Sequence, residues 1–192
     1  MSDALEFLKT RRSVSAAFLS APAPTVDQLN EILTVASRVP DHGKLAPWRF
    51  IVFKDDAPRM ASALLADLYL RKNPGADEKA IEEERKRLAQ APLVIGVVST
   101  AAPHVKIPEF EQVLSGGNAA MSILLAAQAL GFGANWTTGW IAYDTDAGQI
   151  LGLRPGEKFV GFVHIGTPTA PRTDRPRPPL ADIVSEWRAP VP

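Results

Sequence analysis

The chain has 192 residues, of which 46% are hydrophobic and 22% are charged, so it can form one domain with a substantial core. Lys plus Arg and Asp plus Glu both number 21, which gives no net field that would favour nucleic acid or a membrane surface. The absence of cysteine excludes disulfides, thiolate nucleophiles and thiolate metal ligands, and it fits a cytoplasmic protein. The acidic segment 1–6 is not typical of a signal peptide, and three scattered histidines predict no metal site.

The N-terminal segment predicts a short helix followed by two cations. We expect Ser2 to cap a helix that runs to Thr10, with Leu5 and Leu8 facing inward. Arg11-Arg12-Ser13 then has two open interpretations. Two cations at a helix C-terminus are favoured by the macrodipole, and two guanidiniums beside a hydroxyl can also bind a phosphate.

A second helix leads into a loop that is rich in hydrogen-bond donors. The segment from Thr25 to Gln28 has the form of a capping box, and the helix that it begins stops before Pro40. The following loop carries Arg38, His42 and Lys44, and it runs directly into a strand over 48–53. Loops held between rigid elements often bind ligands, but taken singly His42 also fits a solvated loop residue and Arg38 a cation near a helix end.

The next segment predicts two helices and a buried strand. Residues 58–70 form an amphipathic helix, which Asn73-Pro74-Gly75 ends. Residues 77–90 form a highly charged helix that we interpret as a solvated face, so its carboxylates at 82–84 are not candidates for catalysis. The near-continuous apolar run over 92–99 predicts a buried strand.

The chain is organised around the apolar stretch from Pro108 to Trp140. No charged residue or histidine lies between Gln112 and Tyr143, and residues 108–133 predict one long helix without a polar stripe. Such a helix is buried or spans a membrane, and its recurring Gln, Ser and Asn residues favour a buried helix. Its small residues would let another backbone approach, and a second copy of the protein is a natural cover. Residues 134–141 then predict a strand.

The C-terminal part predicts a short helix, a strand and an extended segment. Asp144 caps a helix that ends near Gly152, and the strand over 158–166 contains His164, which we interpret as structural. Residues 167–192 are rich in Pro and Arg and cannot form a core of their own. We expect them to be the C-terminal extension of a single domain, 1–192, and to wrap over a partner subunit. Their apolar anchors would be Leu180, Ile183, Val184 and Trp187.

No common catalytic motif occurs in the sequence. It contains no Gly-rich phosphate loop, nucleophile elbow or HExxH, so an enzyme of this sequence would take its reactivity from an organic cofactor. The polar groups available to such a cofactor are mainly basic or hydroxylic. They are Arg11, Arg12, Ser13, Arg38, His42, Lys44, Thr137 and Thr138. This set suits an anionic, planar ligand, and flavin mononucleotide (FMN) and other nucleotides all match.

Four motifs in order resemble the FMN-dependent nitroreductase family, and most of all its small single-domain bacterial branch. They are Arg11-Arg12-Ser13, the segment 40–50 (PDHGKLAPWRF), the segment 131–139 (GFGANWTTG) and the segment 160–168 (VGFVHIGTP). The resemblance covers nearly the whole chain. It implies an α+β fold, a three-layer α/β sandwich with a mixed, mainly antiparallel sheet. It also implies an obligate homodimer with two FMN sites at the dimer interface.

The resemblance also implies roles for individual residues. Arg11, Arg12 and Ser13 would hold the phosphate end of FMN, and Arg38 and His42 would contact FMN, His42 from the other subunit. Trp136, Thr137 and Thr138 would lie along the flavin. The segment matched to the nicotinamide nucleotide comprises Ala126, Ala127, Gln128, Ala129, Leu130 and Gly131. Arg175 and Arg177 could add phosphate contacts. Lys44 and Ala46 depart from the family, because many members have Asn and Gln there.

The activity implied is electron transfer in two half-reactions at one site. NADH or NADPH gives a hydride to the flavin and leaves, and a nitroaromatic, quinone or related acceptor then takes the electrons, which is a ping-pong mechanism. Two alternatives remain open. One is an FMN-binding or storage module without turnover, and the other is a flavin reductase with a different physiological acceptor.

Overall fold

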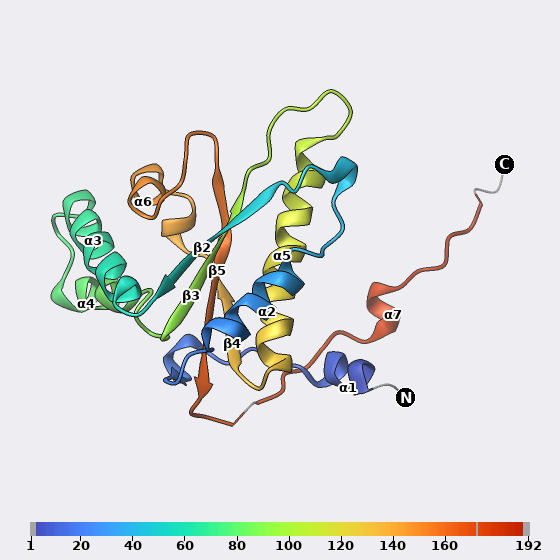
Figure 1. Cartoon of the computed structure of the whole chain (residues 1–192), viewed down its shortest axis with the longest axis horizontal. Coiled ribbons are helices and arrows are strands. Elements are labelled where there is room, and N and C mark those ends of the chain that lie inside the picture. Colours follow the sequence, from blue (N-terminus) through green and yellow to red (C-terminus); the bar gives the residue numbers. More distant parts are fainter. Residues whose placement is uncertain (1–2, 172, 190–192) are drawn as a thin grey trace.

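A five-stranded sheet forms the middle layer of the fold in the computed structural model, which describes residues 3–171 and 173–189. Its strands are β1 (Leu19–Ser20), β2 (Trp48–Lys54), β3 (Leu93–Ser99), β4 (Gly133–Thr137) and β5 (Lys158–Pro168). The strand order is β1-β5-β3-β2, and β4 also pairs with β5 (Figure 1). Every one of these pairings is antiparallel, which confirms the expected mainly antiparallel sheet.

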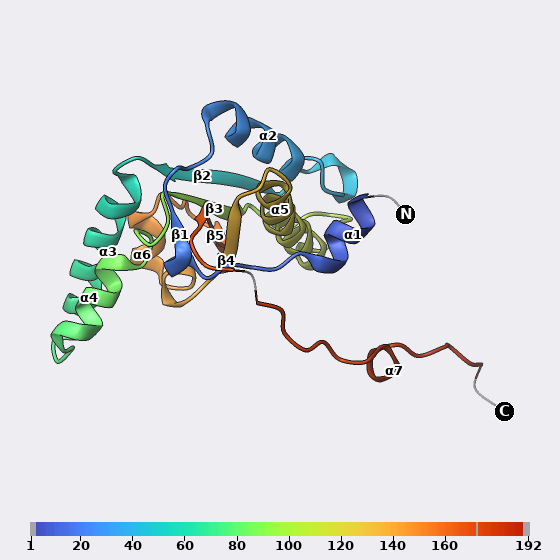
Figure 2. The same cartoon turned by 90° about the horizontal axis from the view of Figure 1, so that it is seen from below.

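Two helical layers cover the two faces of this sheet (Figure 2). One layer contains α2 (Val26–Ala36) and α5 (Glu109–Ala129), and the other contains α3 (Ala57–Lys72), α4 (Glu78–Lys86) and α6 (Thr145–Ile150). Each face has its own apolar core, because neighbouring residues of a strand point to opposite sides. On β5, Val163 packs in the core beneath α5 and Phe162 in the core on the α3 side. The expected three-layer α+β architecture is therefore confirmed.

The start and end of α5 follow from local signals. It begins directly after Pro108 and ends at Ala129, earlier than the predicted end at Gly133. Gly131 has φ +89°, and the Phe132 N–H donates to the Ala127 carbonyl at 3.0 Å. This is the Schellman pattern, in which a glycine in the left-handed region closes a helix. The residues around this helix end are as apolar as the helix itself, so composition alone could not locate it.

The small residues of α5 face the chain's own core. Ala119, Ala120 and Ala127 are fully buried in the cluster that also contains Ile32 and Ala36 of α2. The backbone that approaches α5 most extensively within the chain is therefore that of α2. The other side of α5 is less covered, since Phe110 is 71% exposed and Leu114 is 51% exposed.

Several other elements differ in detail from the sequence predictions. The strand predicted over 134–141 ends at Thr137, because Gly139 takes φ +87° and residues Trp140–Ala142 form a 3-10 helix. The helix predicted to reach Gln90 ends at Lys86. The predicted capping box of α2 is confirmed, with reciprocal side-chain to backbone bonds between Thr25 and Gln28.

The N-terminal helix α1 (Asp3–Thr10) lies at the periphery. Leu5 and Leu8 are 45% and 51% exposed, so the prediction that they face inward is wrong for the chain by itself. Their apolar side chains have no core of this chain to pack into, because α1 stands beside the sheet rather than over it (Figure 2). The predicted cap, Ser2, lies outside the described residues.

The chain after β5 forms an arm that extends away from the sheet (Figure 1, Figure 2). Its one helix among the described residues is the short α7 (Leu180–Ile183). The four apolar anchors predicted from the sequence are at least 62% exposed. No helix in the described part of the chain is long and apolar enough to cross a membrane.

Candidate functional site

Four arginines gather where α1 meets the first part of the C-terminal arm. The Arg11 Nε donates to the Gln128 Oε1 at 3.3 Å, and the Arg11 Nη2 lies 3.4 Å from the Ser13 Oγ. The Arg12 Nε donates to the Thr173 carbonyl at 3.0 Å, which ties the arm to this segment. Arg175 and Arg177 follow on the arm. We call Arg11, Arg12, Arg175 and Arg177 the arginine cluster.

The arginine cluster carries more positive charge than its surroundings neutralise. The pKa of Arg11 is lowered, first by burial and then by repulsion from Arg12, Arg177 and Arg175. Among the described residues, the carboxylate paired with the cluster is Asp174, whose side chain is 84% exposed. Clustered guanidiniums without buried counter-charges are suited to bind a phosphate, to which each can donate several hydrogen bonds. The structure therefore favours the anion-site interpretation of Arg11-Arg12-Ser13.

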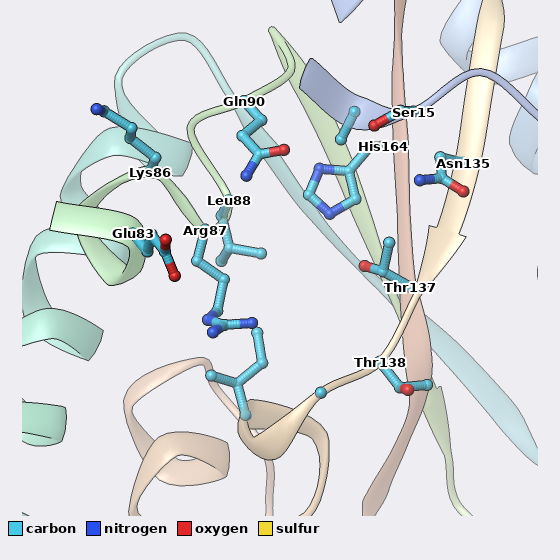
Figure 3. A pocket seen from close by; sticks show the side chains of 13 residues that line it. Ser15, Glu83, Lys86, Arg87, Leu88, Gln90, Asn135, Thr137, Thr138 and His164 are labelled. Carbon is cyan, nitrogen blue, oxygen red and sulfur yellow. The ribbon is translucent and has the colours of Figure 1, made fainter. Parts of the chain in front are cut away.

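A cavity of about 520 Å³ begins close to this cluster, at Ser15 (Figure 3). It lies between the edge of the sheet and α4. Its polar lining comes from Ser15, from Asn135, Thr137 and Thr138 in and after β4, from His164 of β5, and from Glu83, Lys86, Arg87 and Gln90 in and after α4. Leu88 and Ile141 add apolar surface. A cavity with apolar walls and several convergent polar groups is typical of a small-molecule site.

The segment 11–15 links the arginine cluster to the cavity, because it runs beside β4. The Val14 N–H donates to the Ala134 carbonyl at 3.1 Å, so segment 11–15 runs beside β4. This pairing brings Ser13 to one end of β4, while Thr137 and Thr138 line the cavity at its other end. Five of the predicted site residues are thus brought together, namely Arg11, Arg12, Ser13, Thr137 and Thr138.

The sixth residue predicted in this region, Trp136, points to the opposite face of the sheet. Its side chain packs against the core cluster beneath α5, and its buried Nε1 has no hydrogen-bond partner among the residues that the structure describes. A Cβ added at Gly161 would come within 2.2 Å of that nitrogen, so the indole lies directly on the glycine backbone. Trp136 does not line the cavity, because strand neighbours alternate between the faces.

A buried ion pair shapes one wall of the cavity, and the sequence analysis missed it. Glu84 is 4% exposed, pairs with Arg87 and accepts a hydrogen bond from the Trp140 Nε1 at 3.0 Å. The expectation that the α4 carboxylates are solvated is therefore wrong for Glu84. The missed signal is helical spacing, because Ile81 and Leu88 are buried on the same side of the helix.

The same ion pair fixes Arg87 against the cavity rim. A Cβ added at Gly139 would lie 3.1 Å from the Arg87 Nη1, and Gly139 has φ +87°. Any other residue at this position would be strained and crowded. The guanidinium is thus held between Glu84 and the backbone that follows β4.

His164 forms the floor of the cavity and has an unusual environment. It is 2% exposed, lines the cavity, and has a buried Nδ1 that bonds to no group in the described part of the chain. Burial lowers its pKa to about 4, so the imidazole is neutral near pH 7. The sequence interpretation of His164 as a structural residue did not anticipate that it faces a cavity.

Arg38 and His42 lie far from this region. The His42 Nδ1 is 2.7 Å from the Glu111 Oε2 at the start of α5, whereas Arg11 contacts Gln128 near its end. These two contact points are about 25 Å apart at 1.5 Å per helical residue. Arg38 follows α2 and is exposed. One chain therefore does not bring Arg38 and His42 to the arginine cluster.

The segment predicted to contact a nicotinamide nucleotide forms the last turn of α5 and its cap. Ala126, Ala127 and Gln128 are buried, and the Gln128 Nε2 donates to the Arg12 carbonyl at 2.6 Å. Ala129 and Gly131 are exposed, and Leu130 is half-buried. Residues 3–171 and 173–189 contain no group of three His, Cys, Asp or Glu side chains that could hold a metal ion.

Comparison with known proteins gives a consistent result. The model of the nitroreductase family matches residues 8–167. The chain is 40% identical over 166 residues to an Escherichia coli K12 protein named "Putative NAD(P)H nitroreductase YdjA", covering 86% of this chain and 88% of that protein. A Haemophilus influenzae protein named "Putative NAD(P)H nitroreductase" is 40% identical over 167 residues, with the same two coverages.

Solved structures share the fold. The nitroreductase-like family protein from Bacillus cereus has a TM-score of 0.82 at 21% identity, over 98% of each chain. A Desulfovibrio desulfuricans protein, described as a nitroreductase in complex with FMN, has a TM-score of 0.76 at 23% identity, over 99% of each chain. The family match over most of the sequence and two relatives at 40% identity show that this chain belongs to the nitroreductase family.

Proposed function

We propose that the protein is an FMN-dependent oxidoreductase that takes electrons from NADH or NADPH and passes them to a nitroaromatic, quinone or related acceptor. The observation that carries this proposal is the arginine cluster together with the cavity, which the segment 11–15 joins along β4. Family membership and the names of the relatives support the same activity.

The residues of this region fit FMN in its two chemical parts. The arginine cluster and Ser13 would bind the phosphate, because charge-assisted hydrogen bonds to guanidiniums are strong. The cavity would take the planar ring, whose polar edge needs hydrogen-bond partners. Asn135, Thr137 and Thr138 line the cavity and offer side-chain donors and acceptors for this edge. Arg11 would gain most from the anion, since its neighbours now repel its charge.

The protein's own contribution would be binding, orientation and exclusion of water. The chemistry that FMN would supply here is hydride uptake from the nicotinamide donor and electron transfer to the acceptor, so the chain itself need not supply a reactive group. Leu88 and Ile141 would keep one side of the ring dry, and Thr137 and Thr138 would fix its edge. No general acid or base pair is required. One reactive ring face that serves two substrates in turn leads to ping-pong kinetics.

A second copy of the chain would complete the site. The support is that His42 contacts α5 about 25 Å from the point where Arg11 contacts it, and that Arg38 is exposed after the end of α2. Apolar side chains exposed on α5, α1 and the C-terminal arm would supply the interface. They are Phe110, Val113, Leu114, Leu5, Leu8, Leu180, Ile183, Val184 and Trp187. Burying these side chains against a second copy would stabilise a dimer.

The nicotinamide nucleotide would approach near the end of α5. The exposed part of the predicted segment, Ala129 and Gly131, borders Gln128, which is bonded to Arg11. A nucleotide donor carries phosphates of its own, and the arginine cluster would attract it electrostatically. This placement supports the segment 126–131 as a prediction for the donor site.

The test is the visible spectrum of the purified protein together with steady-state assays. The protein should be yellow, should release FMN on denaturation, and should consume NADH or NADPH only with an acceptor. Protein that stays colourless after incubation with FMN would overturn the proposal. Bound FMN without turnover would instead identify a storage module.

A further inference from the structure

One wall of the cavity carries a polar group that the proposed function does not yet use. His164 lies opposite Asn135 in the β4–β5 register, on the same face of the sheet as Phe162. Figure 3 shows its ring directed into the space between Gln90 and Thr137. A histidine in a protein core normally has partners for its nitrogens, but residues 3–171 and 173–189 offer none to the Nδ1 of His164.

The groups around His164 leave it neutral. No carboxylate or cation lies on β3, on β4 or at residues 159–166 of β5. The charged residues of the cavity lining are Glu83, Lys86 and Arg87, on the opposite wall, and Arg87 is already paired with Glu84. A neutral imidazole offers one N–H donor and one nitrogen acceptor. His164 can therefore both give and accept a hydrogen bond.

Two side-chain amides extend this pattern. Asn135 and Gln90 line the cavity on either side of His164, and each amide has a carbonyl acceptor and an NH₂ donor (Figure 3). The pyrimidine edge of a flavin ring presents a carbonyl, an N–H and a carbonyl in alternation. The dimethylbenzene edge presents no hydrogen-bonding group. Only one end of the ring is therefore complementary to this wall.

We infer that His164 binds the pyrimidine edge of the flavin and, together with Asn135 and Gln90, fixes which end of the ring points into the cavity. The inference rests on the proposed function, because it specifies how the same site holds its cofactor. The dimethylbenzene end then points towards the cavity mouth. His164 is a binding and positioning residue for the ring, separate from the arginines that hold the phosphate.

The test compares FMN with 3-methyl-FMN, in which a methyl group replaces the hydrogen on the pyrimidine nitrogen, so that this nitrogen can no longer donate a hydrogen bond. Both are titrated into the apoprotein, the natural chain beside His164→Phe and His164→Gln, and the dissociation constant and the visible spectrum of the bound flavin are recorded. The natural protein should bind 3-methyl-FMN at least about 10-fold more weakly than FMN, the size expected when buried hydrogen-bonding groups lose their partner.

The two variants separate a hydrogen bond from a purely structural role. His164→Phe keeps a planar ring but no hydrogen bond, so it should weaken FMN about 10-fold, weaken 3-methyl-FMN much less and shift the spectrum of bound FMN. His164→Gln keeps a donor and an acceptor and should retain most of the affinity for FMN. A structural role would change the affinities for both flavins equally.

Two results would overturn the inference, and a third would refute the proposed function on which it rests. Equal binding of FMN and 3-methyl-FMN by the natural protein would overturn the inference, even if His164→Phe failed to fold. A His164→Phe protein that binds both flavins like the natural protein would also overturn it. Failure of the natural protein to bind FMN at all would instead refute the proposed function.

Discussion

The positive charge of Arg11 should contribute more to the free energy of FMN binding than to the stability of the apoprotein. In the apoprotein, Arg11→Met removes a hydrogen bond to Gln128 at 3.3 Å and also removes the repulsion from three arginines. Each effect is about 1 kcal/mol and they oppose one another. The unfolding midpoint of the apoprotein should therefore change by no more than about 4 °C in a domain of this size.

The effect on FMN should be much larger. A lost hydrogen bond between charged groups costs about 1.5–3 kcal/mol, which is roughly 10- to 150-fold in the dissociation constant. Riboflavin, which lacks the phosphate, should bind the variant and the natural protein alike. Arg59→Met serves as the matched control, because Arg59 is exposed on α3 and pairs only with Asp56 among the described residues.

The assay is titration of each apoprotein with FMN and with riboflavin, followed by quenching of flavin fluorescence. An equal loss of affinity for both flavins would show that Arg11 acts through the fold and not through the phosphate. A large drop in the stability of the apoprotein would show that repulsion within the arginine cluster is not significant. The first result would contradict the phosphate site, and the second would contradict the balance of forces proposed for the apoprotein.

Three further predictions follow from the interface, the buried ionisable groups and the mechanism. Leu114→Glu on the exposed side of α5 should give monomers in sedimentation and weaken FMN binding, whereas Val26→Glu on α2 should leave both unchanged; monomers that bind FMN normally would refute a shared site. The pKa of His164 is about 4 in the folded protein and 6.5 in the unfolded chain, so between these pH values the unfolded chain binds a proton that the folded protein does not. The free energy of unfolding should therefore fall by about 3 kcal/mol as the pH decreases from 6.5 to 4. The pKa of Glu157, lowered from 4.5 to about 2 mainly by its hydrogen bond with Arg49, adds a separate loss between pH 4.5 and 2, and His164→Phe should remove only the upper step in urea titrations. Double-reciprocal plots for NADH or NADPH and a quinone should be parallel, and intersecting lines would exclude a ping-pong mechanism.

Much of the fold could be predicted because its signals are local. The capping box at Thr25, the apolar run of β3 and the break at Asn73 depend on residues that are neighbours in the sequence. The ends of α5 and β4 were harder to place. Both depend on glycines with positive φ, Gly131 and Gly139, which lie in stretches that remain apolar on both sides.

From the residues themselves, the site could be predicted only where its members are neighbours in a short sequence motif. Arg11-Arg12-Ser13 is compact in sequence, whereas Arg175 and Arg177, more than 160 residues away, were expected only from the family resemblance, and the structure brings their charges close to Arg11. Glu84 and His164 could not be assigned from composition, because their importance comes from partners on other elements. Glu84 needs Trp140, and His164 faces groups from α4 and β4.

In the 40–50 loop, the two residues that depart from the family pattern, Lys44 and Ala46, have an unusual backbone conformation. Lys44 and Ala46 have φ of +58° and +44°, values that few residues other than Gly, Asn and Asp adopt readily. The Asp41 carboxylate accepts a hydrogen bond from the Ala46 N–H at 2.6 Å and holds the loop in place.

The most direct test of the central claim is a crystal structure of the protein with FMN bound. We expect the FMN phosphate within hydrogen-bond distance of Arg11 and Ser13, the ring in the cavity with its pyrimidine edge on His164, and His42 of a second copy beside the same FMN. A phosphate bound away from the arginine cluster, or a ring outside the cavity lined by Thr137 and His164, would contradict the proposed site.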